Sequence, residues 1–214
     1  MSSLSLYKHL IFISILILIH KSINGLDEEN FPLINISPGL FAIQLSIGYP
    51  VHNFLLLVDT SSKYTWVRGT NCTFCSNTEN IYDDESSISV IHQEDTPYTT
   101  MMEIRGSVSG NIVLDDIKLG DYYISKVELL VASEDEFLEF ADGVISLNYP
   151  QENNKNKGII NKLYQNGSIK KKIIYFNIKD EMTGTLLIGK IPEYILSNTD
   201  KSKYTICHIH NDIN

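Results

Sequence analysis

The stretch Phe54-Leu55-Leu56-Leu57-Val58-Asp59-Thr60-Ser61-Ser62 carries an apolar run directly into a polar turn, and Trp66 lies just beyond it. Such a run predicts a buried strand. The strand ends at Asp59, so its carboxylate lies at the start of a tight, turn-forming segment. Several hydrolases hold an acid in place in this way. Acid chemistry of this kind needs two carboxylates, and the sequence contains one such loop.

Length and charge exclude some classes of function. The 214 residues are enough for one domain with a real core. The formal net charge of −9 argues against nucleic acid as a partner, because phosphate binding needs a basic surface.

The N-terminus has the pattern of a secretory signal peptide over residues 1–25. Lys8 and His9 precede an apolar run, Leu10 to Ile19, which is too short to span a bilayer. Removing it takes away two lysines and no acid, so the charge changes from −9 to −11. An uncleaved anchor is the alternative, and it also places the rest outside the cytosol. We expect residues 26–40 to be a short leader.

Sequons and cysteines agree with a secreted or endomembrane-lumenal protein. Glycosylation is expected at three asparagines of N-x-S/T sequons, Asn35, Asn71 and Asn166. Cys72 and Cys75 form a C-x-x-C, which in the cytosol suggests redox chemistry or half a metal site, but behind a signal peptide predicts a small disulfide loop. Cys207 is left over. No metal site is predicted, because His208 and His210 share a strand face without a third ligand.

Short β-rich segments separated by turn signals predict an all-β domain with one or two short helices. Gly106 and Gly110 are expected to bracket the bend of a hairpin, and residues 76–89 are expected to form a surface loop. One helix is expected over residues 158–165. The expected strands are residues 40–47, 54–58, 64–67, 99–107, 110–114, 122–132, 143–147, 172–178, 185–188 and 204–209.

In this order of motifs the chain resembles the amino-terminal lobe of a pepsin-like aspartic protease. The matching segments are Phe41 to Pro50 (the "IGxP" turn), Val58 to Ser62 (the "DTGS" loop) with Trp66-Val67, Cys72 with Cys75, Gly106 to Gly110 (the flap arm), Asp142 to Leu147 (the "DGILGL" strand), Leu163 to Ile169, and Gly184 to Gly189. The resemblance implies a partly open β-barrel or sandwich over residues 41–207, followed by a truncated tail, 208–214.

The resemblance implies peptide-bond hydrolysis by a water held between two aspartates that share one proton, without a cofactor. Asp59 is implied as the first aspartate. Thr60 would hold the loop by a hydrogen bond to the other lobe, and Ser62 would donate to Asp59. The implied substrate is an extended peptide or protein, bound under a flap supported by Trp66.

The sequence departs from the family pattern at the site. Ser61 and Ser146 replace glycines, and the flap positions Glu103 and Ile104 replace a tyrosine and a glycine, ahead of Gly106 and Ser107. A side chain on residue 61 is costly if the backbone there is left-handed. No second "DTG" loop is present, so we expect the second lobe to be absent. Asp142 belongs to the packing strand.

Three interpretations remain open. The chain is an aspartic endopeptidase domain that is inactive alone and needs a homodimer or a carboxyl-terminal lobe. Alternatively it is a non-catalytic secreted lobe, a pseudoenzyme that binds peptides or acts as a decoy. The third is that the sequence is a fragment from an incomplete gene model. In each case an isolated lobe exposes an apolar surface, which predicts association.

Overall fold

The computed structural model describes residues 30–73, 75, 80–102, 106–135, 140–148, 158–179 and 181–197. The expected signal peptide, the tail 208–214, Cys207, His208 and His210 therefore lie outside the described residues, as do the flap positions Glu103 and Ile104.

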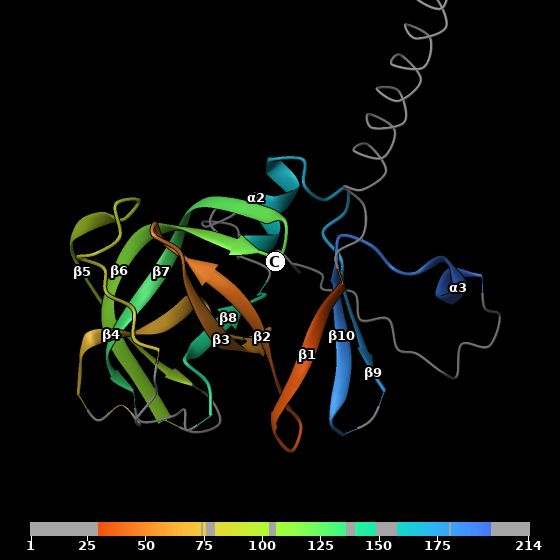
Figure 1. Cartoon of the computed structure of the whole chain (residues 1–214), viewed down its shortest axis with the longest axis horizontal. Helices are drawn as coiled ribbons and strands as arrows, with labels where there is room; N and C mark the ends of the chain where they lie inside the picture. The colour runs from red at the N-terminus through yellow and green to blue at the C-terminus, as the bar shows by residue number, and fades with distance from the viewer. Residues whose placement is uncertain are drawn as a thin grey trace, which may run out of the picture.

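The described residues form one sheet of ten strands and two short helices (Figure 1). The helices are α2 (Ile159–Gln165) and α3 (Glu193–Leu196). The strands are β1 (Asn30–Ser37), β2 (Leu40–Ile47), β3 (His52–Asp59), β4 (Thr65–Thr73), β5 (Ile91–Met102), β6 (Gly106–Leu119), β7 (Tyr122–Asp135), β8 (Gly143–Ser146), β9 (Ile174–Ile178) and β10 (Thr183–Ile188). The expected all-β fold is confirmed.

Six of the strands close into a barrel. Strand order runs β5-β6-β7-β4-β8-β3-β2-β1-β10-β9, and an additional pairing of β2 with β6 joins Ile47 to Ile117. The ring β6-β7-β4-β8-β3-β2 is therefore continuous. Strands β1, β10 and β9 leave it as an open extension, visible beside the barrel in Figure 1.

Strand β3 is buried on both faces, which explains its unbroken apolar run. Leu56 packs in the larger core cluster with Val67 and Ile145, whereas its neighbour Leu57 packs in a second cluster with Trp66. Strand β8 lies between β3 and β4, parallel to the first and antiparallel to the second, and all four of its residues are buried.

Two glycines permit close approach of strands. A Cβ on Gly143 would lie 2.0 Å from the carbonyl oxygen of Trp66, and one on Gly110 would lie 2.0 Å from that of Val131. Any other residue at these positions would push β8 from β4 or β6 from β7.

Three expectations differ from the structure. Residues 30–37 were expected in a leader but form β1, because Phe31 and Leu33 alternate into the core. Gly106 and Gly110 do not bracket the hairpin bend, because both belong to β6, where they pair with Met102 and Tyr98 of β5. Within the expected surface loop, Tyr82 is 2% exposed, because its ring fills a gap beside Phe54.

Candidate active site

Asp59 ends β3, and its side chain is half-buried beside the exposed Thr60 and Ser61. The preceding residues hold the strand firmly, since Phe54, Leu56 and Leu57 are each no more than 5% exposed. A buried strand therefore presents a single carboxylate at its solvent-facing end, as the sequence predicts.

Three donors orient the Asp59 carboxylate. The backbone N–H and the hydroxyl of Ser61 both donate to Oδ1 at 2.7 Å, and the hydroxyl of Ser62 donates to Oδ2 at 2.5 Å. The expected hydrogen bond from Ser62 is present. Because both carboxylate oxygens accept hydrogen bonds from the loop itself, the group is held in one rotamer before any ligand arrives.

Ser61 is accommodated without a left-handed backbone. Among the described residues, Lys126 is the only non-glycine residue with positive φ. The anticipated penalty for a side chain at position 61 is therefore not seen, and the hydroxyl adds a donor to Asp59 that glycine would lack.

Strand β8 and the residues that follow it hold the Asp59 loop in place. Asp59 pairs with Ser146, and the N–H of Leu147 donates to the carbonyl of Asp59 at 2.8 Å. The hydroxyl of Ser146 donates to the carbonyl of Ser62 at 2.5 Å. The side-chain amide of Asn148 donates to the carbonyl of Ser61 at 3.2 Å. Sequence reasoning noted Ser146 only as a departure from a pattern and missed Asn148, which carries no local signal.

Asp142 lies beside the middle of β3, away from Asp59. Its carboxylate accepts hydrogen bonds from the N–H of Leu55 at 2.8 Å and from the amide of Asn80 at 3.1 Å. Leu55 is four residues before Asp59, about 13 Å along a strand. Asp142 therefore secures strand packing and does not lie beside Asp59.

Trp66 is 1% exposed and packs between Leu57, Val144 and Leu130. Its indole nitrogen has no hydrogen-bond partner among the described residues. Of the expected flap, Gly106 begins β6 opposite Met102, and Ser107 is half-buried.

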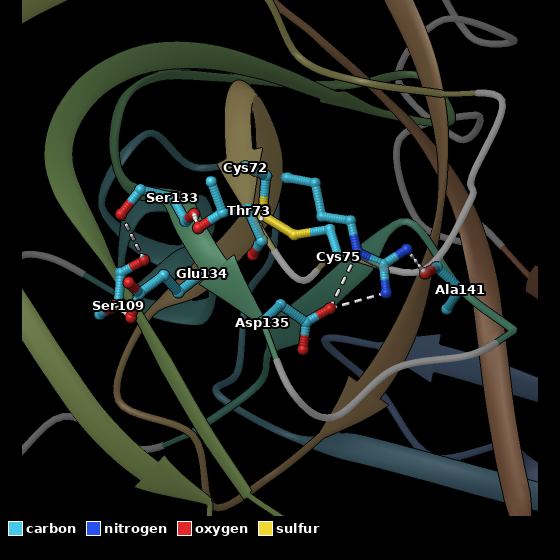
Figure 2. The surroundings of a disulfide bond; sticks show 9 residues. Cys72, Thr73, Cys75, Ser109, Ser133, Glu134, Asp135 and Ala141 are labelled. Carbon is cyan, nitrogen blue, oxygen red and sulfur yellow. Dashed lines mark hydrogen bonds and ion pairs between the residues drawn. A yellow bond between two sulfur atoms is a disulfide. The ribbon is translucent and has the colours of Figure 1, made fainter.

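The disulfide between Cys72 and Cys75 is present. Figure 2 shows it near Asp135 and Ala141, the two residues that Arg68 joins. The Arg68 guanidinium donates through two nitrogens to Asp135 at 2.6 and 2.8 Å and to the Ala141 carbonyl at 3.0 Å, and both charged side chains are buried. This pair links β4 to the end of β7, and sequence reasoning missed it.

The three glycosylation candidates differ in exposure. Asn71 and Asn166 are exposed, whereas Asn35 is half-buried and its amide donates to the carbonyl of Glu181. Glycosylation stays a prediction at all three. No group of three or more His, Cys, Asp or Glu side chains within the described ranges is arranged to hold a metal ion.

A family model described as eukaryotic aspartyl protease matches residues 40–206. The chain belongs to the eukaryotic aspartyl protease family. The expected relationship to pepsin-like proteases is thereby confirmed.

Named aspartyl proteases are among the relatives that the chain resembles. It is 26% identical to vacuolar protease A of Aspergillus fumigatus over 60% of this chain and 33% of the relative. It is 24% identical to aspartic proteinase A3 of Arabidopsis thaliana, over 78% of this chain and 35% of the relative. It is 27% identical to pregnancy-associated glycoprotein 4 of Ovis aries, over 78% of this chain and 45% of the relative.

The chain spans between a third and a half of the length of these relatives. In the part of the chain that the structure describes, no helix is long and apolar enough to cross a membrane.

Proposed function

We propose that this chain supplies one half of an aspartic endopeptidase site, with Asp59 as one of its two catalytic aspartates. The observation that carries the proposal is the carboxylate of Asp59, fixed by three donors at the exposed end of a buried strand. Two aspartates are needed because the ionised one activates a water while the protonated one donates to the scissile carbonyl.

The residues around Asp59 have their own roles in this half-site. Ser61 and Ser62 orient Asp59, and the exposed Thr60 reaches toward the partner that brings the second aspartate. The β5–β6 hairpin, which carries Glu103, Ile104, Gly106 and Ser107, covers an extended peptide substrate above Trp66. Glu103 lacks the apolar ring that the family places at this position, so the cover is weaker.

The second aspartate comes from a second copy of the chain or from a carboxyl-terminal lobe. A monomer with Asp59 alone cannot divide the acid and base roles, so we propose that it is inactive. The chain acts in the secretory lumen or outside the cell. The vacuolar name of one relative and the three sequons support this location.

The test measures cleavage of a denatured protein from pH 3 to 7 at increasing chain concentration. The monomer should be inactive, and activity per chain should rise as copies pair. Asp59→Asn should abolish this activity. Asp121→Asn, the same change at an exposed turn residue, should leave the activity unchanged. Cleavage by a verified monomer would contradict the proposal.

A non-catalytic, peptide-binding lobe is the second candidate function. The altered flap residues Glu103 and Ile104 favour it, because they remove the ring and the flexible glycine that the family uses to close over substrate. If an extended peptide or a transition-state mimic binds the chain, yet no concentration or pH yields cleavage, this second function is favoured.

A further inference from the structure

A basic pocket lies apart from the Asp59 loop, on one face of the open extension of the sheet. Its volume is about 940 Å³, within the usual range for ligand sites. Strand register places Asn30, Leu187 and Tyr175 side by side on the face that lines it. The segment after β10, beginning at Gly189, forms a wall.

The charge of this pocket contrasts with that of the molecule. Its charged lining consists of one glutamate, Glu193, and four lysines, here called the pocket lysines: Lys170, Lys171, Lys179 and Lys190. A net positive pocket in a chain of net charge −9 selects for anionic groups. Lys172, the third of the lysine run, is placed differently, since its ammonium group lies over the ring of Tyr164.

In the sequence, an acidic segment directly precedes one of the residues that line this pocket. Asp27-Glu28-Glu29 immediately precedes Asn30, the first residue of β1 and a lining residue of the pocket. Strand β1 runs antiparallel to β10 with Asn30 opposite Leu187, so the start of β1 lies near the end of β10, where Lys190 follows. Three extended residues reach about 10 Å from Asn30, itself a lining residue of the pocket.

We propose that the pocket is a binding site for a carboxylate-rich peptide, and that its occupant is the segment Asp27-Glu28-Glu29 of the same chain. Attachment through Asn30 keeps these carboxylates at a high effective concentration. An acidic peptide from another molecule must instead overcome repulsion by the chain's overall negative charge. The bound segment anchors the start of β1 to the segment 189–193.

Zero-length carbodiimide cross-linking of the full chain tests the contact, because it joins only touching carboxylates and amines. Peptide mapping should find residues 27–29 joined to the pocket lysines, and not to the exposed Lys63 or Lys118. Cross-links to Lys63 and Lys118 in equal yield, or no cross-link from residues 27–29 to the pocket lysines, would overturn the proposal.

A variant separates an intramolecular occupant from an external one. In the triple variant Asp27→Asn, Glu28→Gln, Glu29→Gln the pocket lysines should be acetylated about two- to fivefold faster, the range expected for exposed ion pairs. Lys118 should react as before. A labelled acidic peptide should bind this variant and not the wild type; equal binding to both would show an open site and overturn the intramolecular occupant.

Discussion

At the scale of single residues, hydroxyl groups hold a second carboxylate besides that of the candidate catalytic Asp59, namely the carboxylate of the buried Asp115. Asp115 is fully buried and accepts hydrogen bonds from the hydroxyls of Tyr82, Ser87 and Ser89. This cluster attaches the segment 80–90 to β6. Burial, and then the hydrogen bond to the Asp115 carboxylate, raise the pKa of the Tyr82 phenol above its ordinary value.

This raised pKa predicts a loss of stability in alkali. Since the folded-state pKa exceeds the unfolded-state value of about 10, the contribution is complete below pH 10 and declines above it as the unfolded chain ionises. Tyr82→Phe should therefore show a smaller decline in unfolding free energy between about pH 8 and pH 11.5.

Urea unfolding at each pH provides the measurement. Tyr49→Phe is the matched control, because the Tyr49 ring is 62% exposed, and it should keep the wild-type decline. Identical pH slopes for wild type and Tyr82→Phe would show that Tyr82 does not contribute.

At the scale of elements, β8 positions the Asp59 loop. Its four residues lie between β3 and β4, and it can approach β4 only because Gly143 has no side chain. From its end, Ser146 holds the carbonyl of Ser62. A short buried strand thus fixes a loop whose own residues are mostly exposed.

Replacing Ser146 with glycine restores the family's residue and should loosen the loop. Losing one hydrogen bond, worth about 1 kcal/mol, should make amide exchange in residues 60–63 about fivefold faster. Hydrogen exchange with mass spectrometry measures this.

The control is Ser133→Gly, which removes a hydroxyl that donates to the carbonyl of Ser109 in the β6–β7 pair. It should leave exchange in the loop unchanged. If Ser146→Gly has no larger effect on the loop than this control, the tether from β8 does not hold it.

At the scale of the whole molecule, the sheet that the described residues form ends at strand β9. Phe176 and Ile178 on it are 40% and 47% exposed, and Met182 in the following turn is 67% exposed. A strand at the end of a sheet with exposed apolar side chains favours association.

A charge on this edge should reduce association. Ile178→Lys should lower the fraction of dimer and larger species in sedimentation runs at a given concentration, because lysine is a common protection of edge strands. Ile88→Lys, the same change at a side chain 78% exposed on the segment 80–90, should leave the distribution unchanged. Equal distributions for both variants would exclude β9 as the contact.

Local patterns anticipated the all-β class, most strands, the helix α2 and the placement of Asp59. They did not anticipate β1. Phe31 and Leu33 alternate as in a strand, but the pattern lies in a stretch interpreted as a leader. Nor did they anticipate Asn148 or the Arg68–Asp135 pair, which bring together positions up to 87 residues apart.

The sequence by itself determined that a buried apolar strand ends at Asp59 in a loop of hydroxyl-bearing residues, because burial and turn formation depend on neighbouring residues. Only the tertiary structure decided what supports that loop. Leu147, Ser146 and Asn148 meet it through the parallel pairing of β3 with β8, which follows from packing of the whole barrel. For the same reason the tertiary structure alone brought four lysines around one pocket.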